Sequence, residues 1–355
     1  MVTPGGPLRD RKVPKTIADR ALALGGKGNR IALGIATLDR ACRGGPLTGK
    51  VIVFGASPGT GKTTLIAQIG HELARRKVWV AILSADEDAD GLLIRIGQNE
   101  RLSREDLEGG NHQSRAVLAG RLRDLSLLLF DADEDEATIE LVAAELAHRA
   151  KGAPSVLIVD SIQTACANGS TDADNPRART DAVMLALKRM AKMHGHLVIA
   201  TSEVSRGWYK NRRDRVDPMA AFKESGGIEY AASMALVMVP VEGHENLVDV
   251  LVPKNRMGQK LPFRLKLCFA RARFEEVELT TDQEPTPAAK VDGIQAAVVK
   301  LLSTRTDLGS KNAVYKVLGG NRNHVLRAIA DLIDQGAIAN LDGALRLTSI
   351  KGGDR

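Results

Sequence analysis

Apolar residues along this chain gather in short continuous runs that alternate with stretches of helical spacing. Helical patterns follow the first run and also cover 137–150 and 181–194. Strands that are apolar on both faces and alternate with helices are typical of a parallel sheet covered on both sides. The pattern therefore predicts an α/β fold, with parallel strands at 51–54, 78–83, 125–130, 155–160 and 196–201 and added antiparallel strands at 235–241, 248–253 and 262–270.

Composition divides the chain into four parts. Residues 1–30 are rich in proline, glycine and basic residues, and they form an arm in our interpretation. Within it Ile17, Ala21 and Leu24 have helical spacing, so a short helix could dock on a neighbouring subunit or pack on its own domain. Residues 31–277 carry the α/β pattern, and 278–292 have the composition of a linker.

The fourth part, residues 293–350, has a different pattern. Three helical stretches come first, and two short β runs then flank the hairpin dipeptide Asp342-Gly343. Three helices followed by a hairpin predict a small winged helix-turn-helix domain.

Net charge and cysteine usage limit the environment and the partners. The formal charge is +7 with a pI of about 9.3, which favours a polyanionic partner about as much as an ordinary basic surface. The three cysteines form no CxxC pair, so we expect neither a zinc site nor disulfides and place the protein in the cytoplasm. The sequence shows no signal peptide and no run long enough to span a bilayer, so we expect no membrane partner.

Residues 56–63, Ala-Ser-Pro-Gly-Thr-Gly-Lys-Thr, match the phosphate-binding P-loop with alanine in the first glycine position. A predicted strand precedes them and a predicted helix follows, as a P-loop requires. Glycines let the backbone N–H groups curl around a phosphate, and the helix N-terminus adds its positive end. We expect Lys62 to reach the β- and γ-phosphates of ATP, with Mg²⁺ on Thr63. The full predicted nucleotide set is Ser57, Pro58, Gly59, Thr60, Gly61, Lys62, Thr63 and Thr64.

Carboxylates at two strand ends supply the remaining chemistry of a hydrolase. Asp160 ends a buried strand, where it can hold Mg²⁺ opposite Thr63. Another predicted strand ends in an acidic run that includes Asp86 and Glu87. Ligands of such sheets bind at the carboxyl ends of the strands. Either Asp86 or Glu87 is therefore our candidate for orienting the attacking water.

Beyond the P-loop, residues 31–277 resemble the RecA-like hexameric helicases of the DnaB type and the related RadA recombination helicase. Residues 84–96 resemble the segment that carries the catalytic glutamate of this group, and a gapless alignment puts Asp86 at that glutamate, next to Glu87. Residues 159–164 resemble the RadA form of the metal-binding strand. Glu203 stands where replicative helicases usually carry a γ-phosphate-sensing glutamine.

Two further segments are specific to this group. Residues 217–232 resemble its Arg-Glu-Ser-Gly-x-Ile-Glu segment, with Lys223 in place of the arginine. Residues 252–258 resemble its Lys-x-Arg motif. The resemblance implies that Lys254 and Arg256 act on ATP bound by an adjacent subunit, and therefore that the chain forms a homo-oligomeric ring such as a hexamer.

Single-stranded DNA is the partner that this resemblance implies. Two polar segments, 166–180 and 205–215, follow predicted strands and could face it. The second combines cations for phosphates with aromatics for bases, in a chain with only 3% aromatics. Its candidates are Arg206, Trp208, Tyr209, Lys210, Arg212, Arg213 and Arg215, although Trp208 could also fold back on the domain.

Asn321, Arg322, Asn323, His324 and Arg327 begin the third helix of the predicted winged helix. They could enter a duplex major groove, or the domain could dock a protein.

These observations predict an ATP hydrolase that works as a ring-shaped DNA helicase or translocase in DNA replication. A RadA-like recombination or repair ATPase is one alternative. Another is a KaiC-like regulatory ATPase that switches protein contacts without DNA.

Overall fold

The chain clusters into two compact units, Met1–Glu278 and Leu279–Arg355. The computed structural model describes a few single positions, at 17, 208, 295, 298, 299, 301–303 and 308, and the continuous ranges 29–168, 175–205, 218–222, 226–279, 310–318, 322–334, 337–341 and 344–348.

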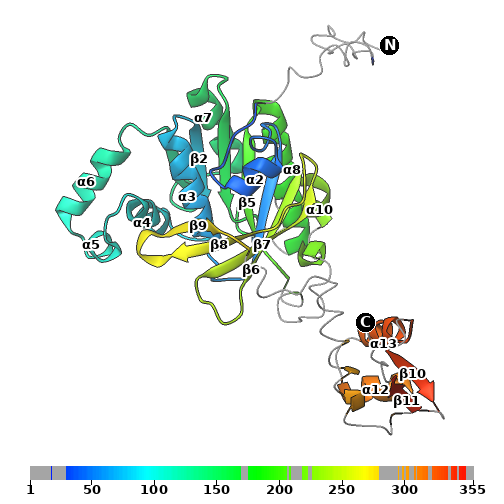
Figure 1. Cartoon of the computed structure of the whole chain (residues 1–355). Coiled ribbons are helices and arrows are strands. Elements are labelled where there is room, and N and C mark those ends of the chain that lie inside the picture. Colours follow the sequence, from blue (N-terminus) through cyan, green and yellow to red (C-terminus); the bar gives the residue numbers. More distant parts are fainter. Residues whose placement is uncertain are drawn as a thin grey trace, which may run out of the picture. The chain divides into compact units, whose positions relative to one another are not determined.

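A nine-stranded sheet forms the centre of the first unit, in the order β3-β2-β4-β5-β1-β6-β7-β8-β9 (Figure 1). The six strands from β3 to β6 in this order run parallel, and β7, β8 and β9 continue the sheet antiparallel. The strands are β1 Val51–Ala56, β2 Trp79–Ser84, β3 Leu127–Asp131, β4 Ser155–Asp160, β5 Leu197–Glu203, β6 Met234–Pro240, β7 Leu247–Asn255, β8 Phe263–Cys268 and β9 Arg273–Val277. The predicted α/β class with a mainly parallel sheet is confirmed.

The direction of β6 corrects the prediction for residues 235–241. We expected an antiparallel strand, but β6 pairs parallel with β1 and only its other neighbour, β7, runs antiparallel. The connection before β6 contains η2 (Pro218–Phe222) and α10 (Gly226–Ala231). These helices return the chain to the amino ends of the parallel strands, as a connection between parallel strands requires.

Helices cover both faces of this sheet and bury alternate strand residues. On one face Ile52 and Phe54 of β1 pack with α2 (Ala36–Ala41), α3 (Lys62–Arg75) and α4 (Ala89–Asn99). On the other face Val51 and Val53 pack with α7 (Ile139–Ala150), α8 (Pro176–His194) and α10. Because successive side chains of β1 point to opposite faces of the sheet, they pack into two separate cores.

Helix α8 begins earlier than the sequence pattern suggested. Asn175 caps it, with its side chain accepting from the N–H groups of Arg177 and Ala178, and Pro176 takes the first turn. Thr180 is buried and its hydroxyl donates to the Pro176 carbonyl. The predicted polar loop 166–180 is thus wrong over its last five residues, which are helical.

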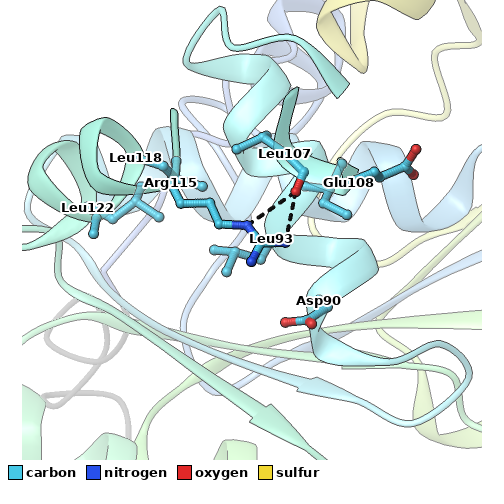
Figure 2. Close-up of a pocket in the computed structure, with 9 residues that line it drawn as sticks. Asp90, Leu93, Leu107, Glu108, Arg115, Leu118 and Leu122 are labelled. Carbon is cyan, nitrogen blue, oxygen red and sulfur yellow. Dashed lines mark hydrogen bonds between the residues drawn. The ribbon is translucent and has the colours of Figure 1, made fainter. Parts of the chain in front are cut away.

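Two short helices that the sequence analysis did not identify follow α4: α5 (Arg104–Glu108) and α6 (His112–Leu122). Together with α4 they enclose a largely apolar groove of about 480 Å³ (Figure 2). Leu93, Leu107, Leu118 and Leu122 are among its lining residues, and Arg115 braces it by donating to the Leu107 carbonyl.

The second unit contains α12 (Lys311–Leu318), α13 (Arg322–Asp334) and the antiparallel pair β10 (Ile338–Leu341) and β11 (Ala344–Leu347). Val298 and Leu302 are helical and buried in the core of this unit. The elements follow the predicted order, and the winged helix itself stays a prediction. The side chains of the five candidate residues at the start of its third helix lie outside the described part.

Among the described residues, no helix combines the length and the apolar character that crossing a membrane demands.

Candidate nucleotide site

The P-loop lies where the sequence predicts it, between β1 and α3. Gly59 and Gly61 have φ values of +76° and +95°, a region that side-chain-bearing residues avoid. A Cβ on Gly61 would also come within 2.8 Å of the Phe274 ring of β9. Both backbone angle and space therefore require glycine at position 61, and helix α3 begins at the next residue.

Lys62 is held beneath this loop by backbone carbonyls. Its Nζ donates to the Ala56 carbonyl at 3.2 Å and to the Ser57 carbonyl at 3.5 Å. The residue is 8% exposed, so little water competes for the ammonium group. A hydrogen bond of 2.9 Å between the hydroxyls of Ser57 and Thr60 closes the loop above it. The amino group is thus positioned to exchange weak carbonyl contacts for phosphate oxygens.

Asp160 is the centre of the polar network beside the P-loop. The Thr63 hydroxyl donates to its Oδ2 at 2.7 Å, and the Thr201 hydroxyl of β5 donates to its Oδ1. Burial raises the pKa of the Asp160 carboxyl, and the two hydroxyl donors and Lys62 oppose that rise. A buried carboxylate beside a threonine hydroxyl is a hard oxygen set that suits Mg²⁺, which binds few protein ligands and completes its shell with phosphate and water. The donors present therefore fit the expected metal.

The structure separates the two water-positioning candidates. Glu87 is paired with Arg95 of α4, with 2.8 Å between Oε1 and the guanidinium. Asp86 is exposed, and the described residues give it no ion-pair partner. Its backbone N–H donates to the Asp160 carbonyl at 3.0 Å, which fixes it beside the metal-ligand candidate. Asp86 therefore has the freer carboxylate of the two.

These groups line one open cleft of about 550 Å³. Of the predicted residues it includes Pro58, Gly59, Gly61, Lys62, Thr63, Thr64, Asp86, Glu87 and Glu203. Its far wall comes from the turn between β8 and β9, where η3 (Phe269–Arg271) contributes Phe269. The sequence analysis did not identify this wall, because only the pairing of the antiparallel strands brings residues 267–272 to the P-loop.

Buried amides pin that wall in place. Gln68 of α3 both donates to the Phe274 carbonyl at 3.0 Å and accepts from the Phe274 N–H at 2.7 Å. On α4, Gln98 donates to the Phe269 carbonyl at 3.2 Å and Asn99 to the Ala272 carbonyl at 3.1 Å. The helix after the P-loop and the helix after Glu87 thus both set the position of the β8–β9 turn.

Lys254 lies on β7 level with the middle of β1, and Arg256 lies level with the amino end of β1, whereas this cleft lies beyond the carboxyl end of β1. In the sheet register Lys254 lies opposite Ala235 of β6, which in turn lies opposite Val53 of β1. The backbone N–H of Arg256 donates to the carbonyl of Ser233, the residue just before β6. The P-loop starts only after Ala56, so Arg256 stands roughly 17 Å away along β1. The Lys254 ammonium donates to the Glu229 carbonyl, and its pKa is lowered by burial and by the neighbouring Arg256. The structure therefore does not bring these two cations to the nucleotide cleft of their own chain.

The candidate DNA-binding residues fall into two groups. Trp208 is 3% exposed and packs in the same core as Val51 and Val53 of β1, and its backbone N–H donates to the Ser205 carbonyl. In this structure Trp208 takes the alternative that the sequence left open and folds back on the domain, where burial of the indole stabilises the core. Arg206, Tyr209, Lys210, Arg212, Arg213 and Arg215 lie outside the described residues, as does Lys223.

A mainly parallel sheet with this P-loop cleft at the carboxyl ends of its parallel strands defines a RecA-like P-loop NTPase. Within that class, residues 31–276 match the model of the DnaB-like helicase C-terminal domain, and the chain belongs to this family.

Sequence identity to individual curated proteins is low. The chain is 27% identical over 207 residues to the DNA repair protein RadA of Brucella abortus, an alignment covering 57% of this chain and 39% of that protein. It is 24% identical over 339 residues to RadA of Halalkalibacterium halodurans, covering 90% and 64%. The replicative helicase DnaB of Helicobacter pylori strain J99 is 22% identical over 233 residues, covering 62% and 47%. The chain thus spans less than two thirds of the length of each.

Solved structures agree on the fold. One solved ATPase domain superimposes with a TM-score of 0.61 at 17% identity, covering 74% of this chain and 96% of that one. A DnaB-like replicative helicase, studied with its interactions with primase, gives a TM-score of 0.61 at 18% identity, covering 74% and 67%.

Proposed function

We propose that this protein is an ATP-hydrolysing motor that assembles into a ring and moves along single-stranded DNA, as a helicase or translocase in DNA replication. The observation that carries this proposal is the separation of Lys254 and Arg256 from the P-loop within one chain. Each chain presents a nucleotide cleft at the carboxyl ends of its parallel strands and a pair of cations on and just after β7, away from that cleft. Copies arranged head to tail would join each cleft to the cations of the next copy, and such contacts give a ring when the rotation between copies closes.

The proposed roles of the cleft residues follow from their contacts. Lys62 neutralises phosphate charge, and Thr63 and Asp160 hold Mg²⁺. Asp86 orients the attacking water, because Glu87 is already engaged by Arg95. Lys254 and Arg256 of the adjacent copy stabilise the negative charge that develops as the γ-phosphoryl group leaves, a contribution worth about 10³-fold or more in rate.

DNA contact is assigned to the segment after β5. The cations Arg206, Lys210, Arg212, Arg213 and Arg215 would track phosphates without reading sequence. Because Trp208 is buried, Tyr209 becomes the stacking candidate of this segment. The winged helix would add a contact to duplex DNA or to a protein partner.

A RadA-like role in recombination or repair is the second candidate. It is favoured by the relative from Halalkalibacterium halodurans, whose alignment extends over 90% of this chain and so beyond the ATPase domain. Both candidates share the chemistry above and differ in the DNA substrate.

The test is the ATPase rate with and without single-stranded DNA, measured beside the particle mass in the presence of ATP. We expect DNA to stimulate turnover and the mass to correspond to a ring. Unwinding of forked substrates without action on recombination intermediates would favour replication, and the reverse would favour the RadA-like role. An ATPase indifferent to DNA would contradict both and favour a regulatory switch.

A further inference from the structure

A second polar cavity, of about 370 Å³, lies at the far end of helix α3 from the P-loop. The last turns of α3 and α4, one residue of α6 and the start of β9 surround it. Its walls carry six guanidinium groups, from Arg75, Arg76, Arg101, Arg121, Arg271 and Arg273. Lys62 and Arg75 are the two ends of α3, so the cavity lies roughly 20 Å along that helix from the phosphate-binding lysine.

The carboxylates of this cavity balance only part of its charge. Glu100 lies 3.1 Å from Arg75 and 3.7 Å from Arg121, and Glu72 pairs with Arg273 at 2.5 Å. Two carboxylates therefore face six guanidinium groups, which leaves an excess of four positive charges. Such an excess disfavours the empty cavity because like charges repel, although Arg75, Arg76, Arg101 and Arg121 are exposed and solvent screens part of that repulsion.

Three of the arginines have no acidic partner within the described residues, and one of these, Arg76, donates to the Ala32 carbonyl instead. Within the part of the chain that the structure describes, neither Arg101 nor Arg271 forms an ion pair, and the buried Nε of Arg271 has no hydrogen-bond acceptor. A buried donor without an acceptor is uncommon in folded proteins and costs free energy. The cavity also reaches a deep wall, since the lining residue His71 is only 2% exposed. An anion with several acceptor oxygens would complement these groups.

We propose that this arginine cavity binds a phosphate-bearing anion, at a site separate from the P-loop. Guanidinium groups form paired hydrogen bonds with phosphate oxygens, and a diphosphate or triphosphate group supplies three to four negative charges. The same phosphate chemistry could come from a free oligophosphate or from a nucleic-acid backbone. The depth of the cavity favours the free anion, because a backbone phosphate of bound DNA contacts a surface more readily than a recess.

The test is calorimetric titration of the full chain with sodium tripolyphosphate. The P-loop is first saturated with a non-hydrolysable ATP analogue, and magnesium is kept in excess over both anions. The test variant is Arg101→Gln with Arg271→Gln. The control is Arg149→Gln, which removes an exposed guanidinium outside the cavity, on α7, where it pairs with Glu145.

We expect the wild type and Arg149→Gln to bind one further tripolyphosphate per chain, and the double variant to bind at least about tenfold more weakly. A 20-nucleotide oligothymidylate forms the second arm of the experiment. If only the oligonucleotide binds, and the double variant weakens it, the phosphate belongs to a nucleic-acid backbone.

Affinity for the ATP analogue reports whether each variant is folded. If the double variant loses that affinity, Arg101→Gln alone replaces it, since this side chain is exposed. Equal binding of both probes by the folded variant and the wild type would overturn the proposal, as would no further binding of either probe.

Discussion

Replacement of Arg256 by alanine tests the arrangement of copies on which the proposed motor depends. Arg256 stands roughly 17 Å from the P-loop of its own chain, a distance that an arginine side chain does not span. We therefore expect Arg256→Ala to bind ATP with unchanged affinity and to lose about 10³-fold or more in turnover. The loss corresponds to about 4 kcal/mol of transition-state stabilisation.

A mixing experiment distinguishes a neighbour's arginine from an indirect effect. Arg256→Ala keeps an intact P-loop, whereas Lys62→Ala keeps an intact arginine, and neither variant alone should hydrolyse ATP. In an equimolar random mixture, half the clefts have the lysine and half of those face an arginine, so about a quarter of wild-type turnover should return. Co-purification of two differently tagged chains verifies that mixed assemblies form. Mixed assemblies that stay inactive at every ratio, or an Arg256→Ala protein with undiminished turnover, would refute the reasoning.

Three further predictions concern the cleft and the core. Asp86→Asn should lower kcat by about 10²-fold or more in a single-turnover ATPase assay, while Glu87→Gln keeps most turnover, because only Asp86 has a free carboxylate. Gln68→Ala should lower the free energy of unfolding by about 1–3 kcal/mol in urea titrations, since the N–H and carbonyl of Phe274 lose their buried partners. Burial lowers the pKa of His196, so its contribution to stability is complete above the ordinary histidine pKa of about 6.5 and is lost as the pH falls below it. The urea midpoint should therefore decrease as the pH is lowered from about 7 to about 5, and the decrease should be smaller in His196→Gln.

Each of these predictions has its own control. Equal losses in the two carboxylate variants would contradict the assignment of the water-positioning role. Gln113→Ala, at an exposed position on α6, should leave the unfolding free energy within about 0.5 kcal/mol, and a similar effect at both glutamines would contradict the proposed clamp. A pH dependence identical in wild type and His196→Gln would show that other groups cause it. The Ser155 hydroxyl and the Ala143 carbonyl, at 2.7 and 3.0 Å, are the contacts that hold His196.

Local pattern was sufficient for five of the six parallel strands and for the P-loop. Continuous apolar runs such as 155–160 can be buried only where both faces are covered, so their strand identity does not depend on distant contacts. Gly59 and Gly61 likewise follow from the backbone angles that the loop needs. The segment 235–241 was given the wrong direction because an apolar run carries no information about the neighbour with which it pairs.

Within the site, the sequence determined which chemical groups are present: a phosphate-binding loop, a metal-binding carboxylate and two acidic candidates on a neighbouring strand. Only the tertiary structure decided which of them are available. It paired Glu87 with Arg95, buried Trp208, brought the β8–β9 turn against Gly61 and gathered six arginines around one cavity. The physical reason is that residue identity and local spacing fix backbone conformation and charge, whereas availability depends on contacts between segments up to about 200 residues apart, which arise only when the sheet closes.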